Sequence, residues 1–187
     1  DTVTVLRDSQ YLYFRITCAE AITAHTEGDH GWMNLWLKTA GAEGDLMGGY
    51  EFVVNYEVSG SKSQILRCKS LNDMQSVGEA DVNVFGNAMI IRIPLEALGL
   101  SENHYQVEFK VTDNVQNMIG DPLNLYSTGD AAPIGSLNFS FGYSCKKTPP
   151  PSALFSWVLS PRRAGMPTRW RSAWTSWHAS WTPPAAR

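Results

Sequence analysis

The chain has 187 residues, with 18 acidic residues against 15 Lys and Arg, for a formal net charge of −3. Residues 1–145 hold all the acidic residues and 8 of the Lys and Arg, so this segment carries −10 and lacks the basic surface that nucleic-acid binding needs. No apolar run approaches the ~18 residues of a membrane-spanning helix, and the segment is long enough for one hydrophobic core.

Ten segments alternate apolar and polar residues with period two, which is typical of strands with one buried face. In chain order they are 2–7, 11–17, 32–38, 50–58, 64–69, 82–85, 88–94, 105–112, 123–127 and 137–143. Gly86-Asn87 is a two-residue hairpin signal, and residues 94–100 (PLEALGL) predict a short helix ended by Gly99. Many short strands with almost no helix predict an all-β protein, an antiparallel jelly-roll β-sandwich.

The segment WMNLWLK (32–38) carries candidate ligand-binding side chains. With its Met and Leu residues toward the core, alternation places three others on the opposite face: Trp32, Asn34 and Trp36. An indole stacks on the C–H face of a sugar ring, and an amide binds sugar hydroxyls. The alternative is that another layer covers this face and the two indoles are packing residues.

The polar loop after residues 105–112 offers oxygen ligands. Four residues could bind a structural calcium ion: Asp113, Asn117, Asp121 and Asp130. Asn114 and Tyr126 are further candidates for binding a glycan beside the Trp pair. The loop does not match the EF-hand pattern, because Met118 stands at the Gly position, and Asp and Asn also favour turns. Turn formation therefore remains the alternative to calcium binding.

The ordered blocks YLYFRIT, GWMNLWLKT, GGYEFVVNY, IRIPLEALGL, VEFKVTDN and GDPLNLYSTGDAAPIGSLNF resemble the family-9-like carbohydrate-binding modules, the sugar-binding branch of the DOMON superfamily. The resemblance covers residues 2–143. It implies a non-catalytic module of a secreted bacterial polysaccharide-degrading enzyme, extracellular or at the cell surface, with the catalytic domain in the same polypeptide. It also implies a glycan or oligosaccharide partner, often a structural calcium ion, and a first strand before Asp1, whose loss would leave a sheet edge unpaired.

Three other functions have weaker support. Glycosidases need two paired carboxylates, whereas Glu51, Glu57 and Glu108 occupy solvent-face positions of strands, and no nucleotide-binding, serine-hydrolase or zinc-protease motif occurs. A haem-binding DOMON-type redox domain would need an axial pair drawn from the residues Met74, Met89 and His104. The third alternative is an accessory structural sandwich without a ligand.

Residues 146–187 have a different composition: no acidic residue, five of the seven Trp, and many Pro and Arg. Four of these Trp recur at helical spacing, as in a basic amphipathic helix at a membrane surface: Trp170, Trp174, Trp177 and Trp181. The abrupt change in composition instead favours a segment outside the fold, either disordered or read out of frame. The predicted sandwich domain therefore spans residues 1–145.

Overall fold

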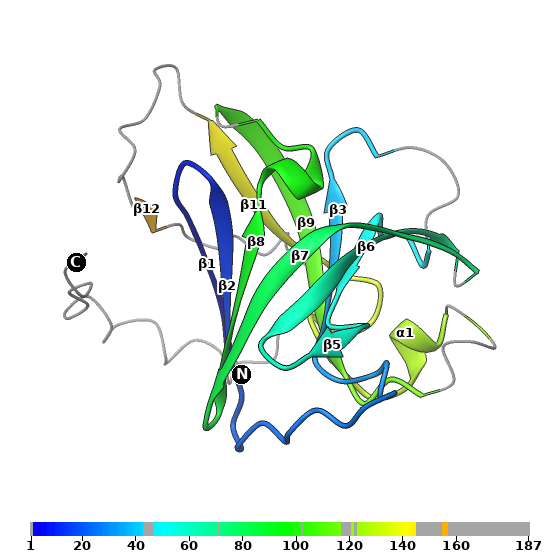
Figure 1. Ribbon diagram of the computed structural model, residues 1–187. Coiled ribbons are helices and arrows are strands. Elements are labelled where there is room, and N and C mark those ends of the chain that lie inside the picture. Colours follow the sequence, from blue (N-terminus) through cyan, green and yellow to red (C-terminus); the bar gives the residue numbers. More distant parts are fainter. Residues whose placement is uncertain are drawn as a thin grey trace.

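A computed structural model of the chain describes residues 2–42, 47–70, 72–101, 103–116, 121, 123–144 and 155–156. Over these residues the protein is a mostly antiparallel β-structure with almost no helix, curled into a half-barrel (Figure 1). The all-β prediction is confirmed. The jelly-roll arrangement is not confirmed, because the strands form one continuous curled sheet rather than two separate sheets.

The strands are β1 (Thr2–Arg7), β2 (Tyr11–Thr17), β3 (Asn34–Thr39), β4 (Phe52–Val54), β5 (Val58–Ser59), β6 (Lys62–Ser70), β7 (Asp73–Phe85), β8 (Ala88–Pro94), β9 (His104–Asp113), β10 (Asp130–Ala132), β11 (Phe139–Ser144) and β12 (Phe155–Ser156). The helical turns are η1 (Glu96–Leu98) and α1 (Asn124–Ser127). The sheet order is β10-β9-β3-β4-β6-β7-β8-β2-β1-β12, with β11 also paired to β9 and β5 paired to β6.

Two local predictions from the sequence were wrong, and one further strand was predicted too short. Residues 50–58 do not form one strand, because Asn55 has a φ of 67° and separates β4 from β5. The strand predicted at 82–85 is the end of the longer β7. Residues 123–127 form α1 rather than a strand: Asp121 accepts hydrogen bonds from the backbone N–H groups of Leu123 and Asn124, which starts a helical turn.

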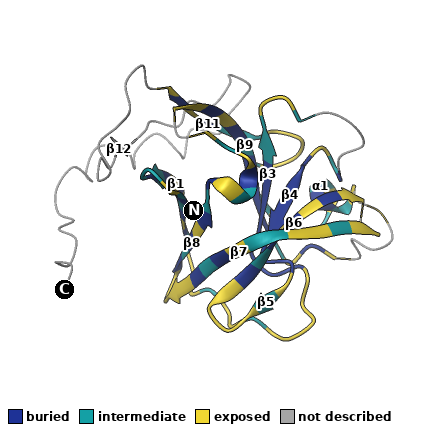
Figure 2. Ribbon diagram, turned by 45° about the horizontal axis from the view of Figure 1, so that its top comes forward, coloured by how far each residue is buried: buried dark blue, intermediate teal, exposed yellow. Residues whose placement is uncertain are grey.

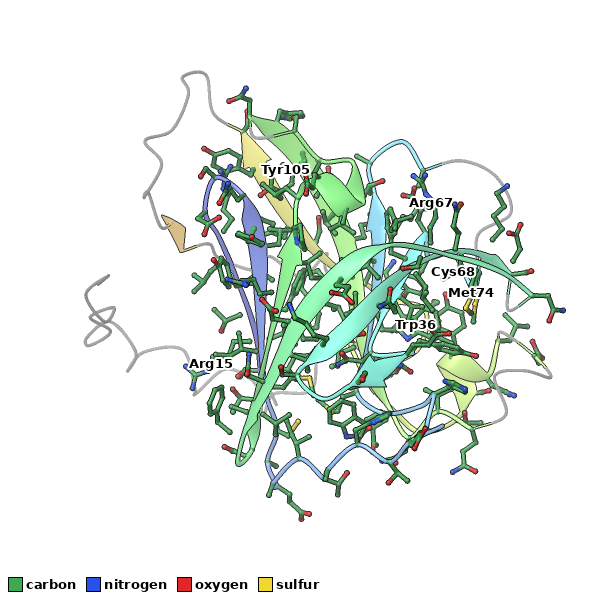
Figure 3. The ribbon with its side chains drawn as sticks, viewed as in Figure 1. Arg15, Trp36, Arg67, Cys68, Met74 and Tyr105 are labelled. Carbon is green, nitrogen blue, oxygen red and sulfur yellow. The ribbon has the colours of Figure 1, made fainter. Side chains whose placement is uncertain are left out.

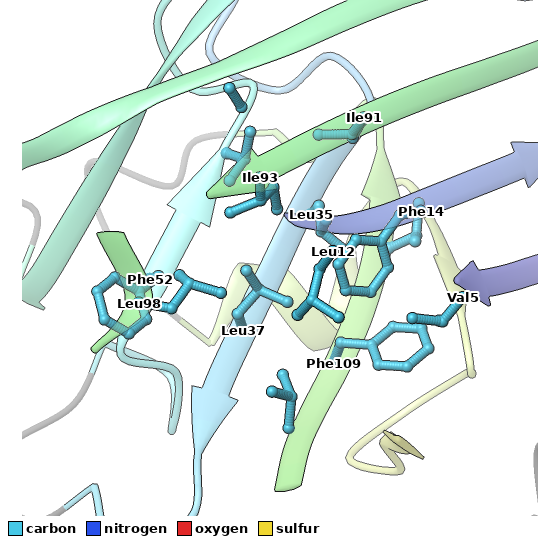
Figure 4. Packing of buried hydrophobic residues seen from close by; sticks show 14 of the residues in the cluster. Val5, Leu12, Phe14, Leu35, Leu37, Phe52, Ile91, Ile93, Leu98 and Phe109 are labelled. Carbon is cyan, nitrogen blue, oxygen red and sulfur yellow. The ribbon is translucent and has the colours of Figure 1, made fainter. Parts of the chain in front are cut away.

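The main hydrophobic core lies between the two arms of the curled sheet (Figure 4). Phe14 of β2 meets Phe109 of β9 edge-on, with ring centroids 5.2 Å apart, so residues distant in sequence close the core. Leu35 and Leu37 of β3, the strand next to β9, enter the core from the same arm as Phe109, and both are fully buried. Each such side chain contributes about 1.5–3 kcal/mol on burial, so this core is the main source of stability.

A second, smaller cluster covers the opposite face of β3, β4 and β6. It contains Trp36, Val53 and Leu66 from the sheet, with Val115 and Leu125 from the segments that close over them. β3 is therefore buried on both faces over residues 34–37, and its neighbour β4 is buried throughout, as the dark blue parts of these strands show in Figure 2. A strand covered on both sides leaves little surface for a ligand.

Two other predictions concern the sheet edge near the start of the chain and the tail of residues 146–187. β1 lies near one edge, and β12 pairs with it at Leu6 and Arg7. Apart from β12, the predicted tail of residues 146–187 lies outside the described residues. Within the described part of the chain, no helix is both long and apolar enough to span a bilayer.

Substitution of Gly129 should lower the free energy of unfolding by a large amount. Its φ is 66°, and a Cβ built on it would lie 2.7 Å from the carbonyl oxygen of Asn114 and even nearer that of Asp113. Gly135 is the matched control, since its φ is 62° but a Cβ there meets nothing within 4 Å. Gly135→Ala should cost about 1–2 kcal/mol of unfolding free energy for the left-handed backbone. Gly129→Ala should cost a further ~1–3 kcal/mol from overpacking.

Urea denaturation of both variants measures this difference. Equal losses of stability would show that the Asp113-Asn114 turn does not lie against Gly129.

Candidate functional site

The predicted stacking face on residues 32–38 does not form, because its two indoles lie in different clusters. Met33 has a φ of 43°, which breaks the alternation before β3 begins at Asn34. Trp32 therefore packs in the main core, 5% exposed, and its Nε1 donates to the carbonyl oxygen of Thr23 at 2.9 Å. The prediction that Trp32 and Trp36 share one open face was wrong.

Trp36 is fully buried in the second cluster, and Figure 3 labels it together with Cys68 and Met74, which belong to or pack against the same cluster. Its Nε1 donates to Oγ1 of Thr112 at 2.9 Å, and its ring lies 6.0 Å from that of Tyr50. Asn34 is also fully buried, and its Nδ2 donates to the carbonyl oxygen of Asn55 at 2.9 Å. In this structure Trp36 connects β3 to β9, Asn34 connects β3 to the segment that follows β4, and neither side chain is open to solvent.

Two of the predicted calcium ligands accept hydrogen bonds from backbone N–H groups instead. Oδ1 of Asp113 accepts from the N–H of Met33 at 3.0 Å, and Oδ1 of Asp121 accepts from that of Leu123 at 2.8 Å. Asp130 is exposed and pairs in register with Asp113. Asn117 lies outside the described residues. Among the described residues, no group of three or more His, Cys, Asp or Glu is placed to hold a metal, and calcium binding stays a prediction.

The two other predicted ligand-binding residues are separated by local structure. Asn114 is exposed, has a φ of 55°, and donates from Nδ2 to Asp113 at 3.1 Å, which fits a turn residue. Tyr126 on α1 packs against the second cluster and donates its hydroxyl hydrogen to the carbonyl oxygen of Gly48. The Nζ atom of Lys110 lies 5.8 Å from its ring centroid. Tyr126 thus adjoins the cluster that contains Trp36, whereas Asn114 points to solvent.

An open hollow of about 270 Å³ lies at one end of the sheet, and we call it the Gln64 hollow. Its lining comes from the loop before β3, from the β4–β5 connection and from β6 and β7: His25, Gly28, His30, Tyr56, Glu57, Val58, Ser59, Lys62, Gln64 and Glu79. This volume lies just below the ~300–1,000 Å³ typical of small-molecule sites, so it suits a single sugar ring or a group of that size.

A stacked ring pair forms one wall of the Gln64 hollow. The His30 and Tyr56 rings are 4.5 Å apart and 12° from parallel, and Nδ1 of His30 is hydrogen-bonded to the carbonyl oxygen of Tyr56 at 2.8 Å. Tyr56 is nearly buried while His30 is exposed. Burial, helped by the neighbouring charge of Glu57, raises the pKa of Tyr56, so the phenol is neutral near pH 7. The exposed ring of His30, stacked on the buried Tyr56, therefore gives the hollow its aromatic surface.

Polar side chains complete the lining of the hollow. Gln64 of β6 pairs in register with Glu79 of β7, and its Nε2 donates to Oε1 of Glu79 at 3.2 Å. Ser76 donates to Oε1 of Gln64 at 2.5 Å, which fixes the amide from its other side. Lys62 donates to Asp81 at 2.5 Å, and this hydrogen bond raises the pKa of Lys62. The sequence showed no motif here, because strand register brings these residues together across the β6–β7 hairpin.

The candidate haem ligands are placed apart. Met89 is fully buried in the main core, whereas Met74 is partly buried against the second cluster. His104 is exposed at the start of β9. The three residues do not converge on one pocket in the described structure.

Comparison with models of protein families, with curated proteins and with solved structures gives no match. The family resemblance therefore stays a prediction from the sequence, and the geometry of the Gln64 hollow carries the functional argument.

Proposed function

We propose that this protein is a non-catalytic carbohydrate-binding module, and that the Gln64 hollow rather than the buried Trp pair receives the sugar. The observation that carries the proposal is the lining of the hollow, which combines the stacked His30 and Tyr56 rings with the hydrogen-bonded amide of Gln64. A sugar needs both elements, because its C–H face packs on a flat ring while its hydroxyls exchange hydrogen bonds with amides and carboxylates.

The remaining parts of the proposal follow from the family resemblance. The module would act extracellularly or at the cell surface, joined to a polysaccharide-degrading catalytic domain of the same polypeptide. A hollow that is open to solvent and holds one sugar ring would bind weakly, with a dissociation constant in the ~10 μM to 1 mM range. Attachment to the catalytic domain would raise the effective affinity through the high local concentration of the substrate.

Gln64→Ala tests the proposed site. A glycan array identifies a bound oligosaccharide, and calorimetric titration then measures its affinity for each variant. We expect Gln64→Ala to weaken binding about fivefold, because a lost hydrogen bond is worth about 1 kcal/mol and 1.4 kcal/mol is tenfold. Gln75→Ala is the matched control, since Gln75 is exposed on β7 and does not line the hollow.

Equal binding by both variants would place the sugar elsewhere. If the folded protein binds no glycan on the array, the carbohydrate-binding proposal is wrong.

A further inference from the structure

The Gln64 hollow is lined by more carboxylates than ammonium groups, and this excess of negative charge affects which sugars it can bind. Two carboxylates, Glu57 and Glu79, and one ammonium, Lys62, line it. Glu79 faces Gln64 in register from β7, and the carbonyl oxygen of Glu57 accepts the backbone N–H of Gln64 at 3.0 Å on the other side. The two acidic residues therefore lie in the two chain segments on either side of Gln64.

The positive charge of Lys62 is already engaged. Its Nζ donates to Oδ1 of Asp81, whose Oδ2 accepts from Arg92. Arg92 in turn lies over the ring of Tyr11, 4.7 Å from its centroid, on the side of β2. Glu57 and Glu79 have no salt-bridge partner in the part of the chain that the structure describes. The hollow thus contains two carboxylates outside any salt bridge of the described residues; the charge of Glu79 still acts on Lys62, where it adds to the larger effect of Asp81 in raising the pKa of that lysine.

From this arrangement we infer that the Gln64 hollow binds glycans that carry a protonated amine, such as polymers of glucosamine, in preference to neutral or acidic glycans. The inference rests on the proposed carbohydrate-binding function and adds the class of sugar. A sugar ring in the hollow lies among these lining residues, so an ammonium substituent on that ring would have the carboxylates of both Glu57 and Glu79 within the same lining. The charge of −10 on residues 1–145 also draws a cationic polymer to this domain and repels an acidic one.

The test compares two probes of equal length, a tetramer of glucosamine and a tetramer of N-acetylglucosamine, at about pH 6, where the free amine is protonated. Calorimetric titration should show the glucosamine tetramer binding about tenfold tighter, and added salt should reduce the difference. Glu57→Gln and Glu79→Gln keep side-chain size and should each reduce the preference several-fold. Glu20→Gln, at an exposed position outside the hollow, should keep it.

Equal affinities for the two tetramers, both weakened by Gln64→Ala, would overturn the amino-sugar inference while the carbohydrate-binding proposal stands. A preference that survives in both the Glu57→Gln and Glu79→Gln variants would also overturn the inference, because the amine would then bind outside the hollow. If neither tetramer binds, the inference fails, and the glycan array decides separately whether the proposed function fails with it.

Discussion

Trp36→Ala should lower the free energy of unfolding by about 3–5 kcal/mol, the range typical of truncating a buried aromatic side chain. Trp36 is 0% exposed and packs against Tyr50 and Val53 in the second cluster. Its removal leaves a cavity between the sheet and the covering segments, and it also removes the hydrogen bond to Thr112. Urea denaturation measures the loss, with far-ultraviolet circular dichroism of the backbone as the signal in place of tryptophan fluorescence.

Phe85→Ala is the control for this experiment. Phe85 is 63% exposed at the end of β7, so its truncation should change the unfolding free energy by no more than about 0.5 kcal/mol. The opposite pattern, with Trp36→Ala stable and glycan binding abolished, would mean that Trp36 contacts the sugar. The proposed site would then move from the Gln64 hollow to β3.

Stability should rise with pH above about 8 because of Lys110. This residue is fully buried on β9, and its Nζ donates to the carbonyl oxygens of Pro133 and Gly135, at 2.8 Å for Gly135. Burial lowers the pKa of Lys110 to about 8, compared with roughly 10.4 for a lysine in an unfolded chain. Between these values the unfolded chain binds more protons than the folded protein, so raising the pH favours folding. Below about pH 8 Lys110 is protonated in both states, and this contribution is lost.

The Lys110→Met variant isolates this effect from other titrating groups. The unfolding free energy of the original protein minus that of the variant should increase by up to about 1.4 kcal/mol per pH unit between pH ~8 and ~10. The unbonded carbonyl groups of Pro133 and Gly135 add an offset that does not depend on pH. Lys69→Met, which removes an exposed lysine from β6, is the control for losing one positive charge.

A constant difference between the protein and Lys110→Met across this pH range would contradict the lowered pKa. Urea denaturation at four or five pH values is sufficient to separate the two results.

Period-two alternation was enough to predict most strands, because a sheet with one buried face requires it. The burial of Val3 and Val5 in β1, and of alternate residues in β2, follows the pattern directly. The Gly86-Asn87 hairpin and the short helical turn ended by Gly99 were also predicted, since both rest on local backbone preferences. Local chemistry is therefore sufficient to predict these elements without knowledge of long-range contacts.

The candidate sites depended on contacts that no local pattern specifies. The left-handed backbone of Met33 sends Trp32 into the main core, although alternation places it beside Trp36. The cover over Trp36 comes partly from residues about ninety positions later, including Leu125 on α1. Alternation indicates which side chains share a face of a strand, but it cannot show whether a later segment will cover that face.

The sequence by itself determined that the described chain is all-β, acidic over residues 1–145, and built from short strands joined by tight turns. The tertiary structure decided that these strands form one curled sheet, that both Trp residues of the segment 32–38 are buried, and that Gln64 and Glu79 lie side by side. The physical reason is range: hydrophobic period and turn chemistry act over a few residues, whereas sheet order, register and burial are set by contacts between strands far apart in the chain.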